Sequence, residues 1–167
     1  MNPSDEMVLI VDAHNRPLGA EPRHVMRSLK LPHRAVYILV FNSKGELFRQ
    51  KRTLTKDIYP GCYDIAAGGV VLDGESNDRA AERELEEELG ISGTPLIPLF
   101  SFCFEDSGNK VFGSVYRTRY DGEIVLQKEE IESGQFCPLK EILKSMPTEP
   151  YTPDGIYVLK EYLKKYK

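Results

Sequence analysis

Residues 69–91 read GVVLDGESNDRAAERELEEELGI, and they decide how the rest of the chain is interpreted. The second half of this stretch predicts a helix over Asn77–Leu89. Ser76 or Asn77 would be its N-cap, because a short polar side chain can satisfy the free backbone N–H groups at a helix start. Gly90 would end the helix, because glycine readily adopts the left-handed conformation found there.

Three carboxylates fall on one narrow face of the predicted helix. With a turn of about 100° per residue, Glu88 lies about 40° to one side of Glu84 and Glu87 about 60° to the other. These like charges repel one another, and a divalent cation would reverse that repulsion. Hard oxygen ligands suit Mg²⁺, with Mn²⁺ as a second candidate. The alternative is an ordinary solvated helix face, since most charge-rich helices bind no ligand.

The remainder of the chain predicts a mixed sheet with helices on two faces. Its clearest strand is Arg34–Phe41, RAVYILVF, which a turn at residues 42–45 joins to a return strand at Glu46–Lys51 in a hairpin. Further strands are expected at residues 7–12, 16–20, 63–67, 70–72, 96–104 and 110–120, and further helices at 22–30, 139–146 and 155–167.

The segment 69–91 as a whole resembles the signature of the Nudix hydrolases. Every specified position of that signature is matched, at Gly69, Glu75, Arg83, Glu84, Leu85, Glu87, Glu88, Gly90 and Ile91. The resemblance implies the Nudix fold, an α+β (α/β) architecture in which a mixed β-sheet is sandwiched between helices. It also implies a single Nudix domain over residues 1–167.

The resemblance also implies roles for the side chains of this segment. Glu84, Glu87 and Glu88 would be metal ligands and catalytic residues, with Glu84 or a nearby carboxylate assisting the attacking water. Arg83 would orient Glu87 as an ion-pair partner one turn away, and Glu75 would be a supporting carboxylate. The family adds one more carboxylate from beyond the helix, for which the best candidate is Glu130; a solvated acidic loop at residues 128–132 is the alternative.

A wider similarity points to the isomerase-like branch of the Nudix proteins, and within it to bacterial hydrolases of the YfcD type. Isopentenyl diphosphate isomerase, in the same branch, uses a catalytic cysteine, a metal-binding histidine and a tryptophan. This chain has Ala67 and Gly69 at the first two positions and no tryptophan, so isomerase activity is disfavoured. His24 and His33 lie near two further isomerase ligands; a surface role is expected for His24 and a structural hydrogen bond for His33.

Composition restricts the partners and the compartment. The formal net charge of −4 argues against a general nucleic-acid binder. No apolar stretch approaches the roughly 20 residues needed to cross a bilayer, and the N-terminus has no signal-peptide pattern. The three cysteines are scattered, which argues against a disulfide framework. A cytoplasmic protein that does not bind membranes is therefore expected.

These observations give one functional hypothesis and two alternatives. The hypothesis is Mg²⁺-dependent hydrolysis of a diphosphate linkage in a small nucleoside diphosphate-type substrate, with Arg52 and Lys56 binding the diphosphate. The alternatives are a diphosphate isomerase and a non-catalytic nucleotide-binding domain. Recognition of the group attached to the diphosphate is expected in loops such as Glu105–Asn109 and Pro147–Asp154, but the sequence specifies neither that group nor the oligomeric state.

Overall fold

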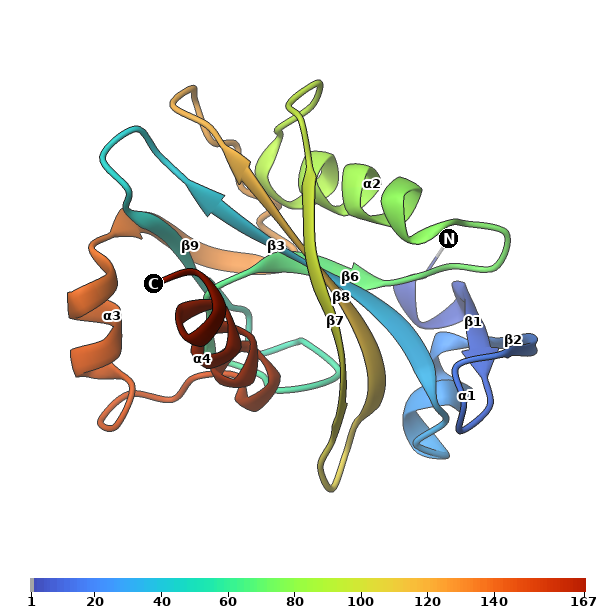
Figure 1. Cartoon of the computed structure of the whole chain (residues 1–167). Coiled ribbons are helices and arrows are strands. Elements are labelled where there is room, and N and C mark those ends of the chain that lie inside the picture. The colour runs from blue at the N-terminus through green and yellow to red at the C-terminus, as the bar shows by residue number, and fades with distance from the viewer. Residues whose placement is uncertain (1) are drawn as a thin grey trace.

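The computed structural model describes residues 2–167 and has a nine-stranded mixed sheet with helices on both faces (Figure 1). The strands are β1 (Met7–Val11), β2 (Pro17–Pro22), β3 (His33–Phe41), β4 (Leu47–Arg52), β5 (Tyr63–Asp64), β6 (Ala67–Val70), β7 (Ile97–Glu105), β8 (Lys110–Arg119) and β9 (Ile131–Cys137). The helices are a short 3-10 turn (Pro3–Asp5), α1 (Arg23–Ser28), α2 (Asn77–Leu89), α3 (Leu139–Ser145) and α4 (Pro153–Tyr166). No helix in this range is long and apolar enough to span a membrane.

Strand β3 forms the centre of the sheet because its apolar run is buried on both faces. Successive side chains of a strand point to opposite sides. Tyr37 and Leu39 accordingly join the hydrophobic cluster that contains the buried residues of α4. Val36 and Ile38 join the cluster built on α2. Figure 1 shows the corresponding layers, with α2 on one side of the sheet and α3 and α4 on the other.

The predicted hairpin between β3 and β4 is only partly correct. The two strands pair at a single position, Phe41 with Leu47, and then diverge. Strand β3 pairs instead with β8, in parallel along its whole length, and with β6, antiparallel over Ala35–Ile38. Because β6 and β8 occupy the edges of β3, β4 turns away and pairs with β5 and β9.

The bounds of two further strands were wrong, and one strand was missed. The strands expected at residues 63–67 and 70–72 correspond to β5, which ends at Asp64, and to β6, which runs through Gly68 and Gly69 instead of starting after them. Glycine permits this pairing: Gly68 has a φ of 155°, and a Cβ there would overlap the carbonyl oxygen of Val36. Strand β9 was missed because its sequence, IESGQFC, buries only its first and last residues and shows no clear alternation.

Helix α2 has the predicted bounds. The Ser76 hydroxyl accepts a hydrogen bond from the Arg79 amide at 3.2 Å, and Gly90 ends the helix with a φ of 69°. Its buried face carries the apolar side chains of Ala80, Ala81, Leu85 and Leu89, and with them the carboxylates of Glu84 and Glu88. The helix therefore directs two acidic groups toward the protein rather than toward solvent.

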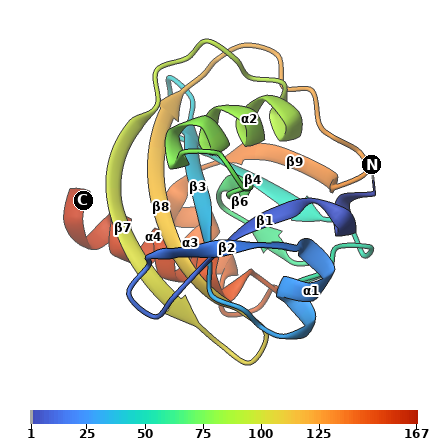
Figure 2. The ribbon, with the colours of Figure 1, turned by 90° about the vertical axis from the view of Figure 1, so that its right-hand side faces the viewer.

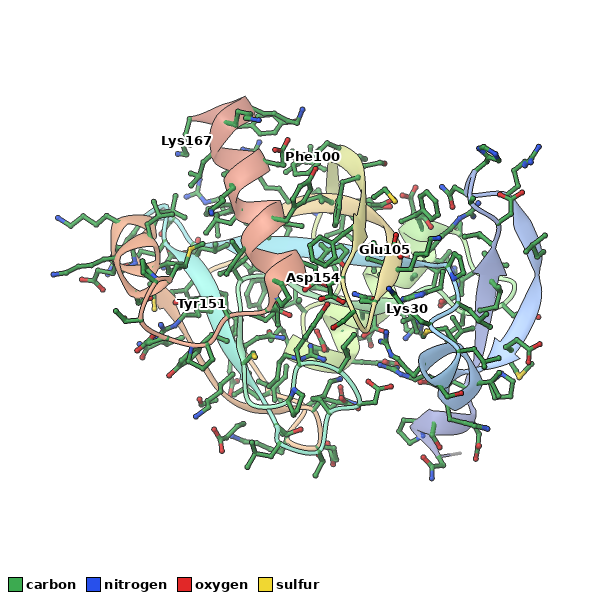
Figure 3. The ribbon with its side chains drawn as sticks, turned by 90° about the horizontal axis from the view of Figure 1, so that it is seen from below. Lys30, Phe100, Glu105, Tyr151, Asp154 and Lys167 are labelled. Atoms are coloured by element: carbon green, nitrogen blue, oxygen red, sulfur yellow. The ribbon has the colours of Figure 1, made fainter. Side chains whose placement is uncertain are left out.

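The N-terminal segment packs against one end of the sheet. Figure 2 shows β1, β2 and α1 together on one side of the molecule, below α2. Ile10 of β1 pairs with His33 at the start of β3. Lys30, which follows α1, forms an ion pair at 3.2 Å with Glu105, the last residue of β7. Both residues are labelled in Figure 3. The N-terminal segment therefore lies beside the start of β3 and the turn between β7 and β8.

Candidate active site

Arg83 organises the carboxylates of the signature segment. Its guanidinium donates twice to Glu75, from Nε to Oε2 at 2.6 Å and from Nη2 to Oε1 at 2.9 Å. Nη1 donates to Oε1 of Glu84 at 2.9 Å and to Oε2 of Glu87 at 3.2 Å. The expected contact with Glu87 is thus present, but the two-pronged contact with Glu75 is the stronger geometry. Arg83 fixes the position of Glu84 relative to strand β6, whose Val70 carbonyl it also contacts.

Glu84 and Glu88 are buried acids. Glu88 is 4% exposed, and its Oε1 accepts a hydrogen bond from the Gly68 amide at 2.8 Å. Burial, followed by the nearby charge of Glu84, raises the pKa of Glu88 to about 8. Burial also raises the pKa of Glu84. The two buried carboxylates repel each other, and a divalent cation beside them would stabilise their charged forms.

The backbone at Gly69 lies directly against Glu84. A Cβ built on Gly69 would be 2.4 Å from Oε1 of Glu84, so only glycine leaves this carboxylate in place. Hard oxygen donors and an unobstructed backbone together fit Mg²⁺ or Mn²⁺. In this conformation, no three His, Cys, Asp or Glu side chains of residues 2–167 converge on one metal position. Glu87 is half-exposed and held by Arg83, so it shares the helix face but not a common coordination point.

A cleft opens beside Gly68 and Gly69, and several charged groups line it. The predicted pair, Arg52 and Lys56, is among them. Arg52 donates to the Ile58 carbonyl at 2.9 Å from Nη2. Lys56 forms an ion pair with Glu130, the predicted fourth carboxylate, which is itself not part of the cleft lining. Lys56 lines the cleft together with Gly68, whose amide holds Glu88.

Sequence analysis missed two further arginines of the cleft. Arg23 and Arg27 come from α1, and the Nε atoms of both donate to Oδ2 of Asp57, at 2.9 and 3.3 Å. Burial would raise the pKa of Asp57, but the two guanidinium groups outweigh it and lower the pKa to about 2. Their spacing of four residues, which puts both on one face of a helix, was the available signal.

The cleft also contains polar residues that the sequence analysis did not single out, because they come from distant segments: Tyr37, Tyr59, Asp64, Asn109 and Asp154. Asn109 and Asp154 are the last residues of the two loops in which substrate recognition was expected. His33 lines it too, but as a buried residue whose Nδ1 lies 2.9 Å from the Leu31 carbonyl oxygen, the structural hydrogen bond that was expected. His24 is exposed, with its Nδ1 2.9 Å from the Ser4 carbonyl oxygen.

The positions that correspond to the catalytic groups of the isomerase face this cleft without reactive side chains. Ala67 and Gly69 both line it. Neither can donate a proton to carbon or bind a metal through a side chain. At these two positions the cleft therefore lacks the cysteine and the histidine that the isomerase uses.

Comparison with known proteins identifies the family of this chain. The family model described as the NUDIX domain matches residues 31–159. The chain is 42% identical to Nudix hydrolase PA4841 of Pseudomonas aeruginosa over 158 residues, covering 95% of this chain and 94% of that protein. It is 37% identical to Nudix hydrolase YfcD of Escherichia coli K12, covering 97% and 89%.

Among solved structures, DR0079 from Deinococcus radiodurans has a similar fold. The TM-score is 0.81 at 26% identity, and the match covers 97% of this chain and all of that one. Enzymes of this family generally depend on divalent metal ions. The chain therefore belongs to the Nudix hydrolase family and is an enzyme that acts on diphosphate, that is phosphoric anhydride, bonds.

Proposed function

We propose that this enzyme hydrolyses the diphosphate linkage of a nucleoside diphosphate, a nucleoside triphosphate or a nucleoside diphosphate conjugate, with Mg²⁺ as its cofactor. One observation carries the proposal: cationic side chains from two segments line the cleft beside the buried Glu84 and Glu88. These cations are Arg23, Arg27, Arg52 and Lys56. Such an arrangement can hold a diphosphate next to metal-binding acids.

The carboxylates of α2 would have separate tasks. Glu84 and Glu88 would supply buried oxygen donors, and Glu87 would complete the set from the half-exposed edge of the helix. A divalent cation bound there would lower the pKa of a coordinated water and neutralise charge on the phosphates. Glu84 or a nearby carboxylate would take the proton of the attacking water. Arg83 would hold Glu84 in place through the contacts described above.

The groups across the cleft would bind the substrate. Arg52 and Lys56 would stabilise negative charge on the diphosphate, as oriented donors do in a partly dehydrated site. Glu130 is proposed as a further carboxylate of the metal site. Its support is its position: it pairs with Lys56, whose charge reaches Glu88.

The test is a panel of nucleotide and isoprenoid diphosphates assayed with Mg²⁺, with Mn²⁺ and with a chelator. Phosphate and nucleoside monophosphate are the measured products. We expect metal-dependent hydrolysis of nucleotides, and a loss of turnover of at least about 100-fold in Glu87→Gln or Glu88→Gln with the fold intact. Glu86→Gln is the matched control, since Glu86 is exposed on the same helix.

Each alternative has its own outcome in this panel. Full activity of both Glu87→Gln and Glu88→Gln would remove these residues from the metal site. A rearranged isoprenoid product without phosphate release would identify an isomerase. Saturable nucleotide binding without turnover in any metal would identify a binding domain.

A further inference from the structure

One part of the cleft carries hydrogen-bond acceptors that hydrolysis of a diphosphate does not use. Asp64 lies on β5, Asn109 in the turn before β8, and Asp154 in the first turn of α4. All three line the same cleft as the cationic groups. Figure 3 shows Asp154 at the start of α4, toward the middle of the molecule. Three segments far apart in the sequence thus bring acceptor oxygens into one place.

Asn109 has an acceptor without a partner. Its side chain is 4% exposed, and its Nδ2 donates to the Tyr59 hydroxyl at 3.4 Å. That hydroxyl in turn donates to Oδ2 of Asp106 at 2.6 Å. The amide nitrogen is therefore engaged, and Oδ1 is buried with no hydrogen-bond partner within residues 2–167. Buried polar atoms are rarely left unpaired, so this oxygen points to a donor that arrives with a ligand.

The two carboxylates are oriented by protein donors. Asp154 accepts two hydrogen bonds, from the Tyr37 hydroxyl to Oδ2 at 2.8 Å and from the Gly155 amide to Oδ1 at 3.0 Å. The Ala66 amide donates to Oδ1 of Asp64 at 3.2 Å. Arg52 lies 3.6 Å from Oδ2 of Asp64. A carboxylate has about four acceptor positions, so each group retains free lone pairs after these contacts. Burial raises the pKa of Asp64 to about 6 and raises that of Asp154 as well.

The cleft brings cations and acceptors together. Arg23, Arg27 and Lys56 line it beside Gly68 and Gly69, the glycines that touch the buried acids of α2. Asn109 and Asp154 line it from the β7–β8 turn and from α4, and Arg52 lies 3.6 Å from Asp64. The same lining thus offers both positive charge and acceptors. A molecule that is anionic at one end and rich in N–H or O–H groups at the other matches both.

We propose that Asn109, Asp64 and Asp154 bind the hydrogen-bond donors of the group attached to the diphosphate, either an exocyclic amine of a nucleobase or ribose hydroxyls. This inference rests on the proposed function, because it assigns the far end of the same substrate. A site built to accept from a substrate N–H or O–H discriminates against an analogue that lacks it, since its own buried acceptor is then left unpaired.

Binding of nucleoside monophosphates tests this without requiring turnover. Calorimetry compares CMP with UMP and AMP with IMP, where an amine replaces a carbonyl, and CMP with dCMP, where a hydroxyl is lost. We expect tighter binding of the donor-bearing member in at least one arm, by about tenfold. Preference in the first two pairs identifies the amine, and preference in the third identifies the ribose.

Variants of Asn109 link the preference to the site. Asn109→Leu should abolish the preference, while Asn109→Asp, which keeps an acceptor oxygen, should retain it. An unchanged melting temperature shows that each variant is folded. If wild type binds all ligands of the panel equally, or if Asn109→Leu keeps the preference, the inference is overturned. Failure of the proposed function would instead appear as absence of nucleotide hydrolysis in the earlier panel.

Discussion

Gly69 and Glu84 are in such close contact that a methyl group on the glycine would lie 2.4 Å from the carboxylate oxygen Oε1. The contact joins strand β6 to helix α2 at the candidate metal site. It explains a glycine in the middle of a paired strand, where the residue otherwise weakens pairing. A side chain at position 69 would push away the Glu84 carboxylate and leave the backbone in place, so it would affect catalysis rather than folding.

Gly69→Ala should therefore inactivate the enzyme without unfolding it. The new methyl group would displace the Glu84 carboxylate from Arg83, and we expect turnover to fall by at least about 100-fold, as for other misplaced catalytic groups. Turnover and melting temperature are the measurements. Gly108→Ala is the control, because a Cβ there meets no atom within 4 Å. Wild-type turnover of Gly69→Ala would contradict the role of Glu84.

Gly68→Ala should have the opposite effect. Here a Cβ would meet the backbone carbonyl of Val36 rather than a movable side chain, and the φ of 155° is unfavourable for alanine. We expect a loss of several kcal/mol in the free energy of unfolding, measured by denaturant titration; substitutions that force backbone shifts cost about 1–3 kcal/mol or more. A variant as stable as wild type would show that β3 and β6 can separate here.

Arg83→Lys should lower turnover more than it lowers substrate affinity. A lysine keeps the charge but cannot donate to Glu75, Glu84 and Glu87 in the same fixed geometry. We expect kcat to fall by about 10- to 100-fold with KM little changed, because the residue positions acids and does not contact substrate. Arg79→Lys, at an exposed position of the same helix, should behave as wild type. A rise in KM by the same factor, with kcat unchanged, would instead place Arg83 in the substrate site.

Arg27→Gln should raise KM for the substrate and leave kcat nearly unchanged. Arg27 lines the cleft and shares Asp57 with Arg23, which is also paired with Glu6 at 3.5 Å. Loss of one charge-assisted contact to a phosphate corresponds to roughly a tenfold rise in KM. Arg16→Gln is the control, since Arg16 pairs with Asp12 on an exposed turn. An unchanged KM would exclude Arg27 from the phosphate site.

His33 should make the protein less stable as the pH falls below about 6.5. Burial is the main reason that its pKa drops to about 4, with the charge of Arg27 adding to the effect. Between pH 6.5 and 4 the unfolded chain binds a proton at this residue that the folded chain does not. The free energy of unfolding should thus fall by about 3 kcal/mol over this range. His33→Gln should remove this component, as seen in the difference between two denaturant titrations; parallel pH profiles would contradict the assignment.

Local patterns in the sequence predicted part of this structure well. Helix α2 was correct from Asn77 to Leu89 because its cap, its charge spacing and its terminal glycine all act within one segment. The burial of Glu88 was not apparent from the sequence. It depends on β6, a distant strand whose Gly68 amide donates to Glu88. Strand β9 was missed because its pairing with β4, not its own side chains, holds it in the sheet.

The same distinction applies to the cleft. Arg52 and Lys56 were found because they lie near each other in the sequence, close to a turn. Asn109 and Asp154 end two loops that were expected to recognise the substrate, but neither residue could be singled out, since the fold brings them together from the β7–β8 turn and from α4. What gathers such residues is the sheet topology, which no single window of sequence contains.

The N-terminal segment of β1, β2 and α1 lies before residue 31, where the match to the family model begins. Arg23 and Arg27 therefore reach the cleft from outside the matched domain. Half of the four cations assigned to the diphosphate come from this segment, so a description of the site that starts at residue 31 omits them.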